Sequence, residues 1–175
     1  GFRAARKAAA ECPQTTCICV SDSESDIYEL LSEPRSEPAA TLDENPSRAV
    51  NLLVRACQDR STETGCILET ARKQRCLFKN TLHLSSRTAK TKAAKGRRKV
   101  SRDSRAAEVE IRAARMTLNP PSRSDRKLPG LSLNVVLVDE PNAPEGSEAV
   151  QWVLLTTLPI DTLEQVQQII EYYCL

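Results

Sequence analysis

The chain has 175 residues, enough for one domain, or one and a half, with a real hydrophobic core, but aromatic residues make up only 3%. No apolar run approaches the roughly 18 residues that a membrane-spanning helix needs, which excludes a helical membrane protein. The net charge of +2 conceals an asymmetry: residues 87–115 hold 11 Lys or Arg and 3 acids (+8), leaving 2 − 8 = −6 for the remainder, a separation that suggests a polyanion-binding surface.

In the N-terminal part, the pattern predicts a helix over residues 1–11, a strand over 15–22 and a short helix over 26–33. Pro34 to Pro46 is proline-rich and acidic, which is typical of a surface loop. A second apolar run, 49–56, predicts a strand that ends on Arg55.

The strand over 15–22 carries the first candidate site residue. Alternation places Cys17 and Cys19 on one face and Ile18 and Val20 on the other, so we expect the strand to be buried on both faces. Asp22 follows at the carboxyl end, the edge where open α/β sheets place their ligands. A carboxylate there is a candidate ligand for Mg²⁺.

Two other interpretations of the acids after this strand remain open. Asp22, Glu24 and Asp26 imitate the first ligand positions of a calcium-binding loop, but Ile27 stands where that loop needs glycine for a sharp turn. Glu24 and Asp26 also fit an acidic helix start, which the helix dipole favours.

The second half of the chain alternates between irregular and strand-like segments. Residues 58–84 predict short extended pieces and turns, and the basic segment 87–102 predicts a mobile loop or arm. Three segments alternate apolar and polar residues between Pro, Gly and Asn turns, which predicts an antiparallel sheet. They begin at Ala107, Leu131 and Gln151.

The last element is predicted to be a helix capped by Asp161, with Glu164 completing a capping box. Its apolar face recurs at helical spacing and consists of Leu163, Val166, Ile169, Ile170 and Tyr173. The order of elements indicates an α/β core interrupted by an antiparallel all-β insertion.

Three features bear on binding. The basic arm is either a solvated charge run or a phosphate contact. Trp152, the sole tryptophan, is either a core residue or a stacking platform for an unpaired base. Seven cysteines without a C-x-x-C pair, and a single histidine, argue against a zinc site and against a disulfide framework, and favour a reducing cytoplasm.

Four stretches together resemble the DDE transposases of the insertion-sequence-four family, bacterial cut-and-paste enzymes. They are Val20–Ile27 (VSDSESDI), Leu53-Val54-Arg55, Gln151–Thr157 (QWVLLTT) and Ile169–Tyr173 (IIEYY). The resemblance implies a partial ribonuclease H-like core over residues 1–56, a β-rich insertion over 57–158 with a basic arm at 87–102, and the start of a core helix over 159–175.

The resemblance also implies site residues. Asp22 matches the second of three catalytic, metal-holding aspartate or glutamate residues, which bind Mg²⁺ or Mn²⁺ and cut and join DNA strands in DNA recombination. Arg55 matches a DNA-contacting arginine, Trp152 the tryptophan that holds a flipped base, and Tyr173 the tyrosine that opens the Y-x-x-R-x-x-x-E signature. The candidate DNA-binding residues of the arm are Lys92, Lys95, Arg97, Arg98 and Lys99.

The sequence departs from the family pattern at Ser23, where an arginine is usual, and the other two metal-binding acids would lie beyond Gly1 and Leu175. We therefore expect a fragment that binds no metal and is inactive alone. It would come from a bacterial cytoplasmic protein that acts on the double-stranded DNA of transposon ends and that could form a homodimer when intact. The alternatives are a non-enzymatic DNA-binding remnant that interferes with an intact transposase, and a small metal-binding module.

Overall fold

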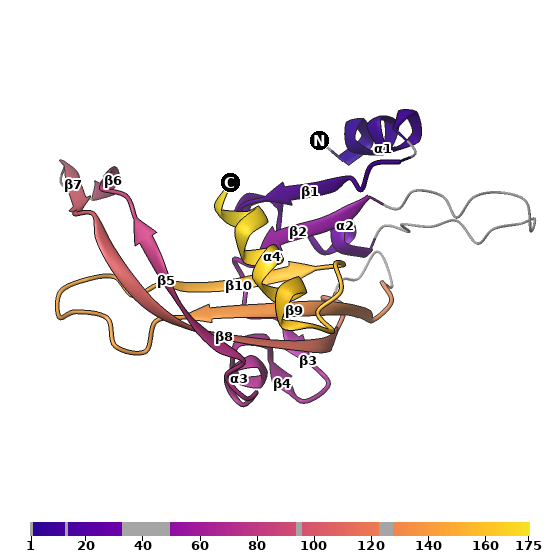
Figure 1. Cartoon of the computed structure of the whole chain (residues 1–175). Coiled ribbons are helices and arrows are strands. Elements are labelled where there is room, and N and C mark those ends of the chain that lie inside the picture. The colour runs from indigo at the N-terminus through magenta and orange to yellow at the C-terminus, as the bar shows by residue number, and fades with distance from the viewer. Residues whose placement is uncertain (1, 13, 33–49, 94–95, 123–127) are drawn as a thin grey trace, which may run out of the picture.

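The computed structural model describes residues 2–12, 14–32, 50–93, 96–122 and 128–175 (Figure 1). Its centre is an eight-stranded sheet in the order β1-β2-β10-β9-β8-β3-β4, with β5 paired to β8. Of the strand pairs described, β1 with β2 is parallel and the others are antiparallel. The described chain is therefore mixed α/β with a mostly antiparallel sheet.

The α-helices described are α1 (Phe2–Glu11), α2 (Tyr28–Ser32), α3 (Ile67–Arg72) and α4 (Leu163–Cys174), and η1 (Ser23–Ser25) is a 3₁₀ turn. The strands of the large sheet are β1 (Ile18–Ser21), β2 (Asn51–Arg55), β3 (Ser61–Thr62), β4 (Gly65–Cys66), β5 (Phe78–Leu84), β8 (Arg105–Leu118), β9 (Leu131–Asp139) and β10 (Gln151–Thr156). A separate two-stranded sheet consists of β6 (Arg87–Ala93) and β7 (Gly96–Arg102). None of the described helices is both long enough and apolar enough to span a bilayer.

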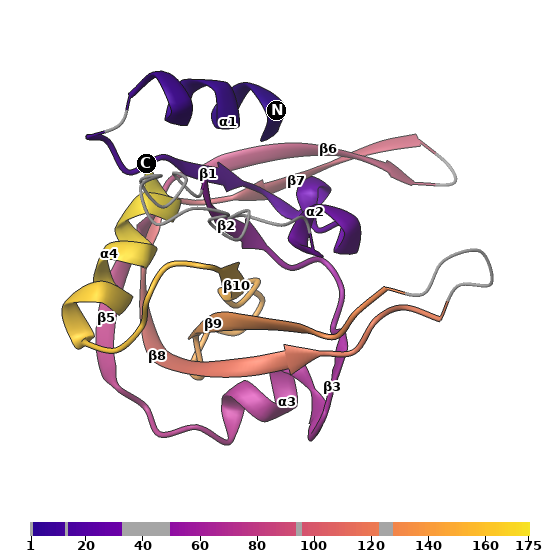
Figure 2. The same cartoon turned by 90° about the vertical axis from the view of Figure 1, so that its right-hand side faces the viewer.

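Both faces of the large sheet are covered, and the helices α4 and α3 lie on different sides of it (Figure 2). On one face, α4 buries Val166, Ile169 and Ile170 against Leu53, Val136 and Leu154. On the other face, α2 contributes Tyr28 and Leu31, and α3 contributes Ile67 and Ala71, to a second apolar cluster with Leu52, Val135 and Leu155. Apolar burial on both faces is what a sheet of largely Val and Leu strands requires.

Much of the predicted secondary structure is confirmed. The helices over 1–11 and 26–33 correspond to α1 and α2, and the strand that ends on Arg55 is β2. The three alternating segments are β8, β9 and β10, and they pair in the predicted antiparallel manner. The predicted loop from Pro34 to Pro46 lies outside the described residues.

The expectation that β1 is buried on both faces is wrong. In the described part of the sheet β1 is an edge strand, paired only with β2, and Val20 is 43% exposed. An apolar run of four residues fits an edge as well as a centre, so composition alone could not place it. Strand β2 also pairs with β10, so one continuous sheet joins the predicted core to the predicted insertion, and the division between them stays a prediction.

Two predictions about helix boundaries are corrected. The region 58–84 contains the predicted short extended pieces, β3, β4 and β5, and also the helix α3, which was not predicted. No capping signal indicates α3: Cys66 at its N-cap makes no side-chain cap bond, and the helix is held by the buried Ile67 and Ala71. At the last helix the N-cap is Thr162 instead of Asp161, and the capping box is completed by Gln165 instead of Glu164. Asp161 with Glu164 and Thr162 with Gln165 both have the side chains and the spacing of a capping box, and the helix uses the second pair.

The basic segment is a β-hairpin and not an irregular loop. Strands β6 and β7 pair antiparallel from Arg87 opposite Arg102 to Ala93 opposite Gly96, and the hairpin extends beyond β5 and β8 (Figure 1). It keeps the register of that pair, in which Leu84 lies opposite Arg105. The loop alternative is wrong because Lys, Arg and Thr replace the apolar residues that reveal a strand by alternation, and the arm alternative stays a prediction.

Candidate functional site

Asp22 lies directly after β1 and caps η1. Its Oδ1 accepts a hydrogen bond from the Ser23 backbone N–H at 2.7 Å, and its side chain is 63% exposed. That hydrogen bond holds the pKa of Asp22 below its usual value; partial burial opposes the shift, and the positive charge of Arg55 reinforces it. Asp22 therefore presents an ionised carboxylate at the end of the sheet.

Arg55 is the last residue of β2, the strand parallel to β1. Ser21 lies opposite Val54 in this pair, so the next residues, Asp22 and Arg55, lie side by side at the C-terminal ends of the two strands. The Arg55 Nη2 lies 2.7 Å from Asp22 Oδ1. The arginine side chain is 32% exposed, so the two groups form an ion pair at the protein surface. Pairs of this kind contribute about 0–1 kcal/mol to stability.

The last turn of α4 brings two aromatic residues together at this pair. Tyr173 donates its hydroxyl to Asp22 Oδ1 at 3.4 Å, and burial raises the pKa of Tyr173, which keeps the hydroxyl protonated. The Tyr173 ring lies 5.2 Å from the ring of Trp152, at an interplanar angle of 63°. This edge-to-face geometry is favourable for aromatic pairs.

Trp152 is half-buried, and its role as a stacking platform stays a prediction. It lies on β10 opposite Val138 of β9, and it is partly buried against the cluster beneath α4. Its ring is therefore supported by the core on one side and by Tyr173 on another.

The structure thus brings together four of the predicted site residues, which come from four different elements: Asp22, Arg55, Trp152 and Tyr173. We call these four residues the edge cluster. Lys92, Arg97, Arg98 and Lys99 belong to the hairpin, but their side chains lie outside the described part of the molecule. Lys95 lies entirely outside the described residues.

Among the described residues, the edge cluster offers a divalent cation one carboxylate. Asp22 supplies a single carboxylate, and Arg55 already contacts one of its oxygens. The described residues contain no group of three His, Cys, Asp or Glu that could hold a metal ion. Mg²⁺ needs an octahedral shell of oxygens and is usually held by one or two carboxylates together with phosphate oxygens and water.

Asp26, which the sequence offered as a calcium ligand or an acidic helix start, has a different role. Its buried carboxylate accepts hydrogen bonds from the backbone N–H groups of Cys57 and Gln58, at 2.9 and 3.2 Å, and forms an ion pair with Arg60 at 2.7 Å. These bonds tie η1 and α2 to the chain after β2, and they engage both oxygens of the carboxylate. The calcium-loop interpretation is therefore not supported, and no spacing rule pointed to Arg60.

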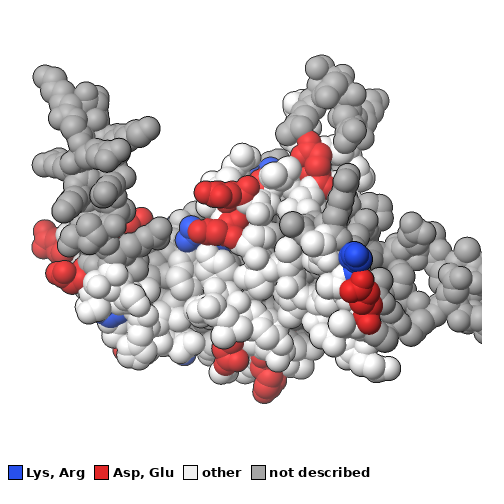
Figure 3. Space-filling model, turned by 90° about the horizontal axis from the view of Figure 1, so that it is seen from above, with Lys and Arg blue, Asp and Glu red and all other residues white. Residues whose placement is uncertain are grey.

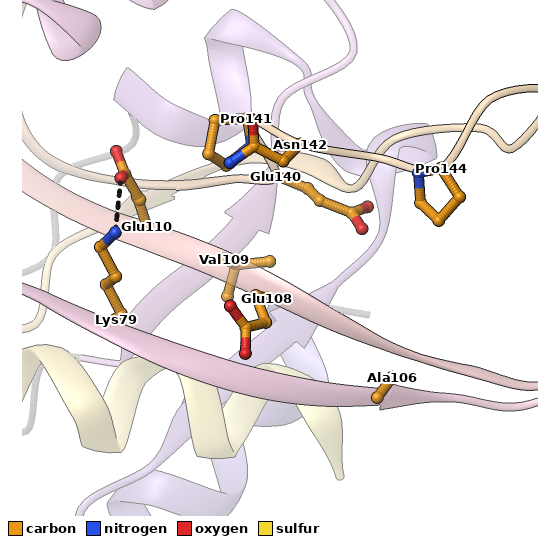
Figure 4. A pocket seen from close by; sticks show the side chains of 9 residues that line it. All are labelled: Lys79, Ala106, Glu108, Val109, Glu110, Glu140, Pro141, Asn142 and Pro144. Atoms are coloured by element: carbon orange, nitrogen blue, oxygen red, sulfur yellow. Dashed lines mark ion pairs between the residues drawn. The ribbon is translucent and has the colours of Figure 1, made fainter.

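A pocket that the sequence did not suggest lies on β8, between β5 and the loop after β9 (Figure 4). Several of its charges are neutralised within the chain: Glu110 pairs with Lys79 at 3.3 Å and with Arg112, and Glu140 forms a two-pronged pair with Arg105. The Arg105 hydrogen bond, with the Val150 backbone N–H, lowers the pKa of Glu140 against the effect of burial. We interpret these ion pairs as structural contacts within the chain.

No family model matches the sequence. The edge cluster is therefore interpreted from its geometry: an ionised carboxylate, a guanidinium and two aromatic rings at the open end of two parallel strands. A guanidinium can bind phosphate, and both rings are half-buried against the core cluster beneath α4.

Proposed function

We propose that the chain is part of the catalytic domain of a bacterial DDE DNA transposase, with Asp22 as one of its three catalytic carboxylates. The observation that supports the proposal is the edge cluster. Arg55, Trp152 and Tyr173 were singled out by resemblance to that family, and they are up to 151 residues from Asp22 in sequence. Arg55 and Tyr173 contact Asp22, and Trp152 contacts Tyr173. Residues of a shared site are expected to lie together in this way.

The fold is compatible with this proposal at a finer level. In a ribonuclease H-like core we expect parallel strands whose carboxyl ends carry the acids. Strands β1 and β2 are parallel, with Asp22 directly after β1 and Arg55 at the end of β2. The β-rich segment between β2 and α4 would be the insertion. In such an enzyme Mg²⁺ or Mn²⁺ supplies the activation of water or of a 3′ hydroxyl.

The chain's own residues would act on the DNA strand. Arg55 would bind a phosphodiester oxygen, since a guanidinium forms strong charge-assisted hydrogen bonds with phosphate. Trp152 would stack on an unpaired base, with Tyr173 holding the indole ring in place.

A second candidate function, a non-enzymatic DNA-binding remnant, is favoured by the hairpin. Its register places Lys90 opposite Lys99 and Lys92 opposite Arg97. Residues of like charge at opposed positions destabilise a pair of strands, and a polyanion would relieve the repulsion. By contrast, Asp and Glu are the more prominent charged residues among those described on the face in Figure 3, which is unfavourable for DNA.

DNA binding tests both candidates. Changing Lys92, Lys95, Arg97, Arg98 and Lys99 to alanine should weaken binding to a labelled duplex and reduce the slope of log K against log salt by roughly 0.9 for each phosphate that the variant no longer neutralises. Fluorescence anisotropy at several salt concentrations gives both quantities. Arg75→Ala, which removes an exposed charge with no ion pair among the described residues, is the control. Unchanged affinity in the five-residue variant would exclude the hairpin as a DNA contact.

The two candidates differ in chemistry. We expect the purified chain to bind DNA but to leave a transposon-end duplex uncut in Mg²⁺ or Mn²⁺, because the described residues offer one of the three carboxylates that the proposed mechanism uses. Gel analysis of an end-labelled duplex measures this. Cleavage that disappears in Asp22→Asn would contradict the expected inactivity and would establish an enzyme.

A further inference from the structure

The three groups that contact Asp22 all use the same oxygen. The Ser23 N–H, the Arg55 guanidinium and the Tyr173 hydroxyl lie 2.7, 2.7 and 3.4 Å from Oδ1. None of these three contacts between described residues uses Oδ2, the other oxygen of the Asp22 carboxylate. In the contacts described, Arg55 is therefore held by one oxygen of an exposed carboxylate, although a guanidinium can bind two acceptor oxygens at once.

We propose that Asp22 occupies the position on Arg55 that a phosphodiester takes when DNA binds, so that Asp22 restrains DNA binding until it is displaced. This inference rests on the proposed function and names a regulation of the same site. A phosphate offers Arg55 two oxygens in the fork geometry that a guanidinium matches. The contact it replaces is a single-oxygen pair with Asp22 63% exposed, which solvent screens strongly.

The displacement would extend to the aromatic residues. Tyr173 shares Oδ1 with Arg55, and its ring contacts Trp152. When Arg55 turns to phosphate, the charge that holds Asp22 in place is withdrawn, and Asp22 and Tyr173 can separate. The Tyr173 hydroxyl then loses its acceptor, and the fluorescence of Trp152, the single tryptophan, reports the change because the two rings are in contact.

The chain provides a matched pair of variants for the test. Asp22→Asn and Glu24→Gln each remove one exposed carboxylate charge, two residues apart, but only Asp22 contacts Arg55 in the contacts described. General electrostatics acts on both variants alike, whereas release of Arg55 acts on the first alone. Asp22→Ala is a second variant, since asparagine keeps an oxygen that can bind Arg55.

Binding to a labelled duplex is measured in EDTA, with folding of each variant checked by circular dichroism. We expect Asp22→Asn and Asp22→Ala to bind roughly two- to fivefold more tightly than the parent, which is the weight of one exposed ion pair, and Glu24→Gln to bind less than about twofold more tightly. In the Arg55→Ala background the gain from Asp22→Asn should vanish. Trp152 fluorescence should change on DNA binding in the parent, and less in Arg55→Ala.

Each other result is decisive. Equal gains in Asp22→Asn and Glu24→Gln, with Arg55→Ala still weakening binding, would overturn the restraint and leave the proposed DNA site intact. A gain that persists without Arg55 would likewise overturn it. Binding that is indifferent to Arg55→Ala, or no binding by the parent, would overturn the proposed function and this inference with it.

Discussion

Replacing Asp26 by alanine should lower the free energy of unfolding by about 3–5 kcal/mol, the usual cost of removing one partner of a buried ion pair. The Asp26 side chain is fully buried, and Arg60, its partner, is only 10% exposed. The substitution would leave the guanidinium without its carboxylate and the N–H groups of Cys57 and Gln58 without their acceptor. Urea denaturation followed by circular dichroism measures the loss.

The control is Glu24→Ala, which removes an exposed carboxylate from the neighbouring turn. It should change stability by less than about 0.5 kcal/mol, as surface substitutions usually do. Asp26→Asn should fall between the two, because the amide keeps one acceptor oxygen but loses the charge that Arg60 needs. If Asp26→Ala were as mild as Glu24→Ala, the network that ties α2 to the chain after β2 would not exist in solution.

Ile169→Ala should cost about 2–5 kcal/mol, the range for removing a large aliphatic side chain from a packed core. Ile169 is 1% exposed and lies between α4 and the sheet, in the cluster that includes Leu154. Loss of its packing should also loosen the end of α4, where Tyr173 contacts Asp22. Thermal or urea unfolding gives the first effect, and the emission of Trp152 gives the second.

Leu163→Ala is the matched control on the same helix, because Leu163 is 50% exposed. Its cost should be well below that of Ile169→Ala, since the cost of a deletion grows with the cavity it leaves. Similar losses for both variants would mean that α4 does not pack on the sheet as described.

The elements with a clear period were predictable from the sequence, and their ends and surroundings were less so. Strands β8, β9 and β10 alternate strongly, and α4 repeats apolar residues at helical spacing, so local pattern sufficed. Leu163 belongs to that pattern but lies in the first turn of the helix and is half exposed. Helix α3 and the edge position of β1 depend on tertiary contacts, which cannot be predicted from the local sequence pattern.

The same division applies to the site. Asp22 was predicted from its place after a strand, and Arg55, Trp152 and Tyr173 were added only by resemblance. Asp26 was misinterpreted because a carboxylate in an acidic turn looks exposed in sequence, while its burial depends on Arg60, 34 residues away. Residues 87–102 predict a loop or arm instead of paired strands because polar strands without apolar alternation resemble linkers.

The shared register of the hairpin limits how related chains can vary in length. Positions 78–84 lie opposite 105–111, and positions 87–93 lie opposite 96–102. Both sets of partners share the same register. Losing a single residue from one arm would turn every later residue to the opposite surface of the ribbon and mismatch its partners. Losing equal numbers of opposed residues from the two arms would leave the remaining partners opposite one another. Changes in the length of the two arms are therefore tolerated in pairs.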